Sequence, residues 1–254
     1  MSYKKLNNIT GWVVFAIATF VYLSTMEQTT SLWDCGEYIT TANKLEVGHP
    51  PGAPLFMMLG RLFSAFASPE NAAMMINSMS TLSSSFSILF LFWSITMLAR
   101  KMAKLNGEID RNSSFAIIGA GLIGALSYTF TDSFWFSAVE GEVYAMSSFF
   151  TAIVFWAILK WDIEDDQYNE SKEKSNTTHP NRWILFICYM IGLSIGVHLL
   201  NLLAIPAIVF VIYFKKYDFS WKSFFLAGLA SLVVLGTIQS IIIPSTCFKY
   251  NKSC

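Results

Sequence analysis

The sequence predicts an all-α protein, a polytopic transmembrane helical bundle of about seven spanning helices with a short interfacial helix in its external first loop. Two observations support this fold class. Hydrophobic residues make up 54% of the 254 residues and charged residues only 13%, which is far more apolar than a soluble domain. Apolar runs of membrane-spanning length recur along the chain, and Lys and Arg gather between alternate runs, as they do in cytoplasmic loops.

The first spanning helix is expected at about residues 10–25 and the first external loop, with the candidate active site, at 26–70. Lys4 and Lys5 precede the helix, as they would in a signal peptide. No small-residue cleavage site follows, so we expect an uncleaved helix that runs outward. Within the loop, residues 55–67 are too short to span and contain Arg61, which indicates an interfacial helix.

The next three helices follow from length and charge. They are expected at about 71–99, 114–131 and 142–160, with the densest basic cluster after the first and a short external turn at 131–141 between the other two. The hydrophilic segment 161–182 has no apolar periodicity and predicts a flexible cytoplasmic loop. The stretch Gly119-Ala120-Gly121 lies inside a predicted spanning helix, so it indicates helix packing and not a nucleotide fingerprint.

The apolar run 183–214 is longer than one helix needs. Because it contains Gly196, Asn201 and Pro206, we interpret it as two shorter helices that turn near 196–201, with one long kinked helix as the alternative. A last helix is expected at about 223–243. We expect residues 1–254 to form a single transmembrane module, the amino-terminal part of a longer protein, because residues 243–246 resemble a connector.

Composition argues against several other classes of protein and site. The 17 basic and 17 acidic residues cancel, so no global field favours nucleic acid as a partner. No internal repeat suggests the paired halves of a transporter. The four cysteines lack zinc-ligand spacing, and Cys247 and Cys254 would form a disulfide only if both lay on an oxidising face.

Two carboxylates and a histidine stand where the first spanning helix meets water. Asp34 and Glu37 are three residues apart, so they would share a helix face and act as general base and positioning group, or hold a divalent cation. The alternative is a solvated pair that caps a helix. His49 precedes Pro50-Pro51-Gly52, whose rigid path would present the imidazole reproducibly; the alternative is that His49 caps the following helix.

Four further polar residues are candidates for substrate binding. Glu140 and Glu142 flank Gly141 at the outer end of a predicted helix, where they would bind a hydroxyl-rich ligand or only stabilise the helix dipole, by about 0.3 to 1 kcal/mol each. His198 and Asn201 lie one turn apart in an apolar run. They would contact a ligand near the external surface, or form a polar pair that supports helix packing.

Four blocks of sequence stand out together: residues 33–38 (Trp-Asp-Cys-Gly-Glu-Tyr), 48–52, 138–144 and 196–201. These blocks resemble the polytopic glycosyltransferases of the GT-C fold, and most closely the bacterial membrane family similar to eukaryotic protein O-mannosyltransferases of the plexin-modifying type. The resemblance implies transfer of a sugar, mannose or another hexose, from a polyprenyl-phosphate donor to a Ser or Thr hydroxyl of a protein acceptor. It also implies the bacterial inner membrane, with the active face in the periplasm.

The resemblance implies roles for individual residues. Asp34 would accept the proton of the acceptor hydroxyl or orient that hydroxyl, and Glu37 would help position the acceptor or a cation. His49 or Arg61 would neutralise the leaving phosphate. Two other classes compete: a transporter or channel subunit with Asp34, Glu37 and His198 along an ion path, and a noncatalytic subunit of an envelope-assembly complex.

Overall fold

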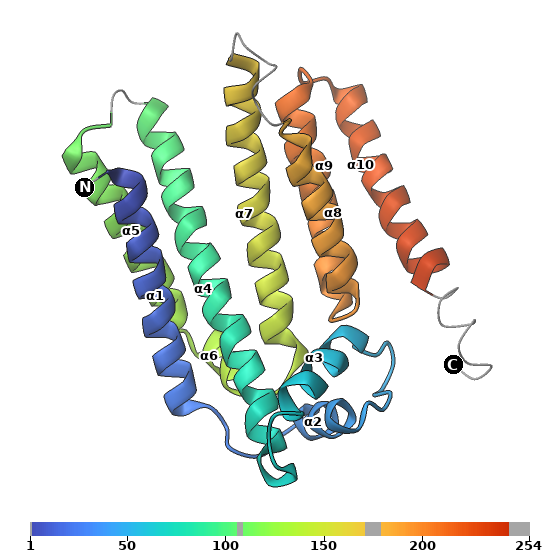
Figure 1. The fold of residues 1–254 in the computed structure, drawn as a ribbon. Coiled ribbons are helices and arrows are strands. Elements are labelled where there is room, and N and C mark those ends of the chain that lie inside the picture. The colour runs from blue at the N-terminus through green and yellow to red at the C-terminus, as the bar shows by residue number, and fades with distance from the viewer. Residues whose placement is uncertain (1, 106–108, 171–178, 244–254) are drawn as a thin grey trace. The chain divides into compact units, whose positions relative to one another are not determined.

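The computed structural model describes residues 2–105, 109–170 and 179–243, and their regular structure is entirely helical (Figure 1). The predicted all-α, polytopic helical fold is confirmed. In chain order the main helices are α1 (Tyr3–Thr25), α2 (Cys35–Lys44), α3 (Pro54–Ser64), α4 (Ala72–Leu105), α5 (Arg111–Thr129), α6 (Asp132–Val139), α7 (Val143–Glu170), α8 (Asn181–Ile195), α9 (Ala204–Lys216) and α10 (Trp221–Thr237). Short 3-10 or π turns stand at Pro69–Asn71, Leu199–Leu203 and Ile238–Ile242.

Among the described residues, five helical segments are long and apolar enough to cross a membrane. They are Tyr3–Thr25, Pro69–Lys104, Val143–Glu170, Leu199–Lys216 and Trp221–Ile241. The pair α5 and α6, bent by 66°, forms a sixth span if it crosses as one unit. The five or six candidate spans compare with the predicted number of about seven, and the expected span at α8 has only 15 residues. At 1.5 Å per residue it is shorter than a hydrocarbon core of about 30 Å.

The chain forms two compact units, Met1–Leu199 and Leu200–Cys254. In the second unit, α9 and α10 pack through aromatic rings, with the centroids of Phe210 and Phe224 5.0 Å apart. The hydroxyl of Tyr213 accepts a hydrogen bond from the Ser220 amide at 3.1 Å and so closes the turn between these helices. Two helices, α8 and α9, replace one long kinked helix, as the favoured interpretation of 183–214 predicted.

The core of the first unit is built around α4, which packs against α1, α5 and α7. One buried cluster joins α1, α4, α5 and α6; it contains Val14, Ala18, Tyr22, Ile88, Phe92, Ile118, Ala125, Phe134 and Ala138. The Tyr22 hydroxyl donates to the Thr129 carbonyl at 2.9 Å, which satisfies a carbonyl that the end of α5 would otherwise leave unpaired. Close packing of α5 on α4 depends on Gly121, where a β-carbon would lie 2.5 Å from Thr96 Cγ2.

Two segments predicted as loops are helical. The flexible loop expected from residue 161 is wrong for 161–170, because α7 continues to Glu170 and buries Trp161 and Asp165. Ion pairs add to this burial: Lys101 pairs with Asp162, and Arg182 pairs with Glu164 at 2.8 Å. Residues 181–182 of the same predicted loop begin α8, and residues 171–178 lie outside the described residues, as do Cys247 and Cys254.

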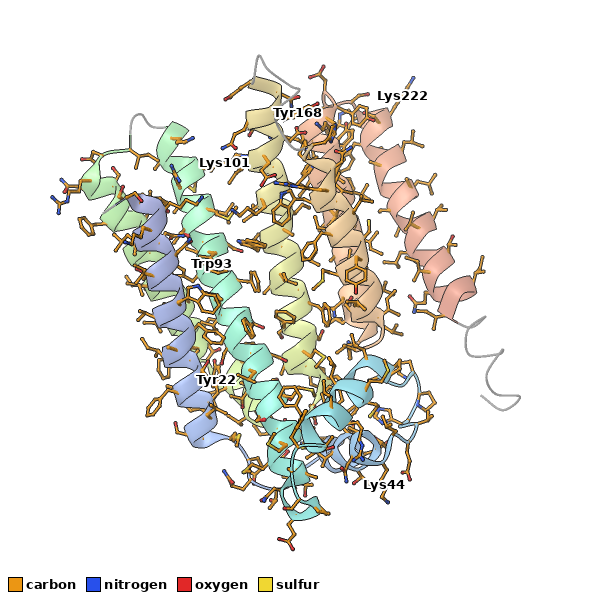
Figure 2. All side chains as sticks on the ribbon, viewed as in Figure 1. Tyr22, Lys44, Trp93, Lys101, Tyr168 and Lys222 are labelled. Carbon is orange, nitrogen blue, oxygen red and sulfur yellow. The ribbon has the colours of Figure 1, made fainter. Side chains whose placement is uncertain are left out.

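The turn expected at 131–141 is also different, since α6 occupies most of it. Phe134 and Ala138 of α6 are buried in the core cluster, and this tertiary contact favours a helix over a solvated turn. At the same end of the unit lie α2 and the short helix α3, opposite the end marked by Lys101 and Tyr168 (Figure 2). The functional candidates of the first loop therefore gather at one end of the bundle.

Substitution of Gly121 tests the packing of α4 against α5. Gly121→Ala would place a β-carbon against Thr96 and Phe92, and we expect it to lower the free energy of unfolding by about 1–3 kcal/mol. Gly119→Ala on the same helix is the matched control, because its β-carbon meets nothing within 4 Å. Thermal unfolding in detergent measures both. Equal effects of the two substitutions would contradict the assigned packing.

Candidate active site

A cavity of about 290 Å³ lies where four segments of the first unit meet. These segments are the start of α2, the loop before α3, the start of α7 and the turn after α8. The lining residues are Asp34, Tyr38, His49, Pro51, Gly52, Glu142, Val143, Tyr144, Val197, His198 and Leu199. All four sequence blocks that carried the resemblance contribute to this lining, although they are far apart along the chain.

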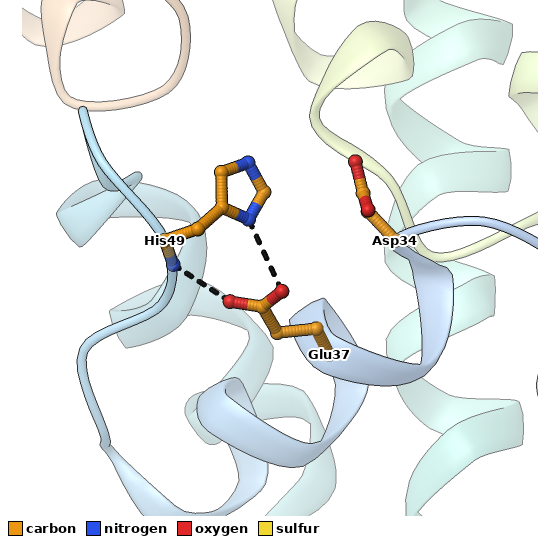
Figure 3. Close-up of side chains that lie close together, drawn as sticks. All are labelled: Asp34, Glu37 and His49. Atoms are coloured by element: carbon orange, nitrogen blue, oxygen red, sulfur yellow. Dashed lines mark hydrogen bonds and ion pairs between the residues drawn. The ribbon is translucent and has the colours of Figure 1, made fainter.

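Glu37 and His49 hold the loop before α3 against α2 (Figure 3). The backbone N–H of His49 donates to Glu37 Oε1 at 2.6 Å, and His49 Nδ1 lies 3.1 Å from Glu37 Oε2. The backbone hydrogen bond, followed by the imidazole contact, lowers the pKa of Glu37 below its ordinary value. Glu37 is therefore an ionised carboxylate whose two oxygens are both engaged with His49.

Asp34 stands immediately before α2, where a carboxylate commonly caps the helix. Its side chain makes no capping hydrogen bond, so the capping interpretation is wrong for Asp34. In Figure 3 its carboxylate lies across from the His49 ring, and it lines the cavity. The preceding residue, Trp33, has a φ of 63°, a left-handed conformation that is strained for an aromatic residue. Backbone strain thus adjoins the most exposed acidic group of the cavity.

Asp34, Glu37 and His49 carry groups that could bind a cation. One potential ligand atom from each of Asp34, Glu37 and His49 lies within 4.8 Å of the others. Two carboxylates and an imidazole suit a divalent cation. Glu37 and His49 already bind one another, however, so a cation would have to replace or share their contact.

Glu142 brings a second carboxylate into the cavity from the start of α7. Its side chain is buried, with 6% of the residue exposed. Burial raises the pKa of Glu142 to about 7, and the nearby charges of Glu140 and Asp34 add to this effect. Asp34 and Glu142 therefore have different environments within one cavity, one exposed and one buried.

His198 enters the cavity from the turn after α8, and its ring centroid lies 5.5 Å from that of Tyr144. Partial burial lowers the pKa of His198 below its ordinary value. The imidazole is therefore mainly neutral at pH 7 and can donate one hydrogen bond and accept another.

Three predicted substrate-binding residues do not line the cavity. Arg61 donates to the backbone carbonyl of Asn43 at 2.9 Å and to its side-chain oxygen at 3.2 Å, so it ties α3 to the end of α2. Glu140 accepts a hydrogen bond from the Ser31 hydroxyl, and burial raises the pKa of Glu140. Asn201 is a buried residue of the second unit.

Two tyrosines of the lining were not among the predicted residues. Tyr38 packs edge-on against His49, with centroids 5.7 Å apart, and burial raises the pKa of Tyr38 to about 12. Tyr144 is half exposed beside His198. Both tyrosines belong to the four sequence blocks described above. Tyr38 follows Glu37 directly and Tyr144 stands two residues after Glu142, and this proximity in the sequence could have identified them.

Comparison with known proteins identifies a family that this chain matches over most of its length. Residues 34–221 match the family model described as protein O-mannosyl-transferase TMEM260 N-terminal domain. The chain is 28% identical over 228 residues to the protein O-mannosyl-transferase tmem260 of Dictyostelium discoideum, which covers 88% of this chain and 26% of that protein. It is 24% identical over 162 residues to the mouse protein O-mannosyl-transferase TMEM260, covering 64% of this chain and 20% of that protein. No solved structure matches the chain.

The chain thus spans about a quarter or less of the length of these two relatives. The family match begins at Asp34 and covers the segments that supply the whole lining of the cavity. Because that match extends over well more than half of the residues, the chain belongs to the family of the protein O-mannosyl-transferase TMEM260 N-terminal domain.

Proposed function

We propose that this chain forms the catalytic transmembrane part of a GT-C-type enzyme that transfers mannose or another hexose from a polyprenyl-phosphate donor to a Ser or Thr hydroxyl of a protein. The names of the two relatives support O-mannosyl transfer to protein. The observation that carries the proposal is the cavity in which Asp34, Glu142 and two imidazoles meet. Acidic, basic and aromatic groups around one hollow suit a sugar phosphate and an alcohol acceptor.

Asp34 is the proposed general base. It is exposed, lines the cavity and makes no capping hydrogen bond to α2, so its carboxylate can accept the proton of an acceptor hydroxyl. The hydroxyl oxygen then forms the bond to the anomeric carbon, and the bond from that carbon to the phosphate oxygen breaks. Glu37 has the different role of holding His49, since both of its oxygens are engaged there.

His49 and His198 are the proposed partners of the leaving phosphate, because both line the cavity. Glu37 occupies the Nδ1 side of His49, which leaves Nε2 as the ring atom for a ligand. Arg61 was an alternative partner, but its guanidinium binds Asn43 at the end of α2. Hydrogen bonds from imidazole N–H groups would stabilise the charge that develops on the phosphate.

We propose that the cavity faces the external side of the membrane. The basic residues that follow the first predicted inward helix include Lys101, which lies at the opposite end of the bundle from Lys44 of α2 (Figure 2). Basic residues gather on the cytoplasmic side. The proposed bacterial inner membrane rests on the resemblance alone, and the two relatives described above are from eukaryotes.

The two competing classes make different demands on the same residues. An ion path would need ionisable groups near the middle of the spans, whereas Asp34, Glu37 and His198 all lie in segments outside the spans. A noncatalytic assembly subunit would need Asp34 only for local stability.

Replacement of Asp34 tests the proposed base. In the protein expressed in its native membrane, Asp34→Asn should reduce transfer from polyprenyl-phosphate mannose to a Ser- and Thr-containing acceptor by about 10²- to 10⁴-fold. Glu46→Gln is the matched control, because Glu46 is also an exposed carboxylate beside α2, just after its last residue, and does not line the cavity. Wild-type transfer rates in a well-folded Asp34→Asn protein would exclude Asp34 as the base.

The Glu37–His49 contact predicts coupled effects. Glu37→Gln should reduce kcat/KM by about tenfold, because it weakens the contact that holds the loop before α3 against α2, and His49→Ala should reduce it further, because it also removes an imidazole proposed to bind the leaving phosphate. The double variant should lose little more than the worse single variant, because both changes remove one contact. Losses that multiply in the double variant would mean that the two residues act independently.

The raised pKa of Glu142 predicts a pH effect on the anionic donor. With its pKa at about 7, Glu142 is mostly neutral at pH 6 and mostly charged at pH 8, where it repels the phosphate. The donor KM of the wild type should therefore exceed that of Glu142→Gln several-fold at pH 8, and the two should agree at pH 6.

The raised pKa of Glu142 also predicts how the stability of the protein changes with pH. Because folding raises the pKa of Glu142, the wild type should lose stability relative to Glu142→Gln as pH rises from about 4.5 to 7. Below that range the two proteins should unfold alike. A constant difference in KM and in unfolding temperature across these pH values would contradict the assigned ionisation.

A further inference from the structure

Asn77 of α4 contacts the connector that leads to Asp34. Its side chain is fully buried, and its Nδ2 donates to the carbonyl of Glu27 at 2.7 Å and to that of Thr29 at 2.9 Å. Residues 26–34, between α1 and α2, contain no regular helix. Hydrogen bonds from Asn77 therefore satisfy backbone groups that have no helical partner and fix the path of the connector.

The same side chain contacts the turn that leads to Glu142. Gly141 lies so close that a β-carbon there would be 2.8 Å from Asn77 Oδ1 and 3.1 Å from Ile39 Cγ1. Only glycine fits this approach without movement of its neighbours. The amide of Asn77 is thus placed between the segment that ends at Asp34 and the turn that presents Glu142.

Other contacts bring these two segments together around Asn77. The Glu27 amide donates to the Val139 carbonyl at 2.9 Å, and the Ser31 hydroxyl donates to the Glu140 carboxylate. Asn77 Oδ1 itself is buried without a hydrogen-bond partner among the described residues, which costs free energy that an apolar residue would avoid. The stabilising contribution of this asparagine therefore comes from its two Nδ2 hydrogen bonds to the connector.

We propose that Asn77 is a positioning residue of the active site, which holds the Glu27–Thr29 backbone against the Gly141 turn and so sets Asp34 opposite Glu142. Its catalytic consequence rests on the proposed function, but the positioning does not. A shorter residue such as Ala would release both the connector and the turn. The expected result is a cavity whose two carboxylates no longer keep a fixed separation.

Cys35 provides a test that does not depend on activity. It follows Asp34, is fully buried and begins α2. In the full protein in its native membrane, with its other cysteines replaced by Ser, Asn77→Ala should increase the rate of Cys35 alkylation by a polar maleimide about tenfold or more. Ser85→Ala is the matched control, since Ser85 is also buried on α4 but bonds only within its helix, to Thr81.

Gly141→Ala tests the same contact from its other side, with Asn77 intact. It should also increase Cys35 alkylation, and its effect should be smaller in the Asn77→Ala background, where the amide that it displaces is gone. If Asn77→Ala fails to fold, the single Gly141→Ala variant still decides the question. Unchanged alkylation of Cys35 in a folded variant of either kind would overturn the proposal.

Kinetics then separate positioning from the proposed reaction. Asn77→Ala should lower kcat about tenfold or more and change the donor KM less than about twofold, since the lining side chains remain. A fall in kcat no larger than that of Ser85→Ala would overturn the catalytic part of the proposal. Absence of transfer by the wild type would instead refute the proposed function, while the alkylation result would still decide whether Asn77 positions the connector.

Discussion

The double contact between Glu37 and His49 is the interaction on which the candidate site depends. The loop before α3 contains two prolines and Gly52 and has no helical hydrogen bonds of its own to define its path. The backbone N–H and the imidazole of His49 both bind Glu37, and this brings Pro51 and Gly52 to the cavity wall. A further link comes from the Leu55 amide, which donates to the Gly196 carbonyl at 2.8 Å and so places the turn that carries His198 beside α3.

The two carboxylates of the cavity show how position determines protonation. Asp34 is exposed, whereas Glu142 is buried and lies in the field of Asp34 and Glu140. Bringing a phosphate into this cavity with all of these groups charged would be unfavourable. A neutral Glu142 lowers that cost. Asp34 can then serve as the base, while Glu142 does not repel the phosphate. This division of roles follows the general behaviour of paired carboxylates in different environments.

Much of the fold and part of the site could be predicted from the sequence. Apolar runs identified the spanning helices because lipid imposes a length and a composition on them. Asp34, Glu37 and His49 were identified together, since ionisable residues beside a spanning helix are costly unless they have a task.

The extension of α7 to Glu170 could not be predicted, because it depends on the burial of Trp161 and on partners from other helices. Arg61 was a candidate for phosphate binding because of its charge, but its guanidinium donates to two oxygens of Asn43 at the end of α2. The role of Asn77 could not be predicted, because α4 contains many small polar residues. That role depends on contacts with Glu27, 50 residues earlier in the chain, and with the turn at Gly141.

The central claim is that the cavity binds the sugar phosphate of the donor beside Asp34. Photo-crosslinking with a polyprenyl-phosphate sugar analogue that carries its reactive group next to the phosphate tests this directly in the native membrane. The account predicts labelled peptides from the loop at 48–52 and the turn at 197–199, with labelling suppressed by unmodified donor. Competable labelling confined to other parts of the chain would contradict it.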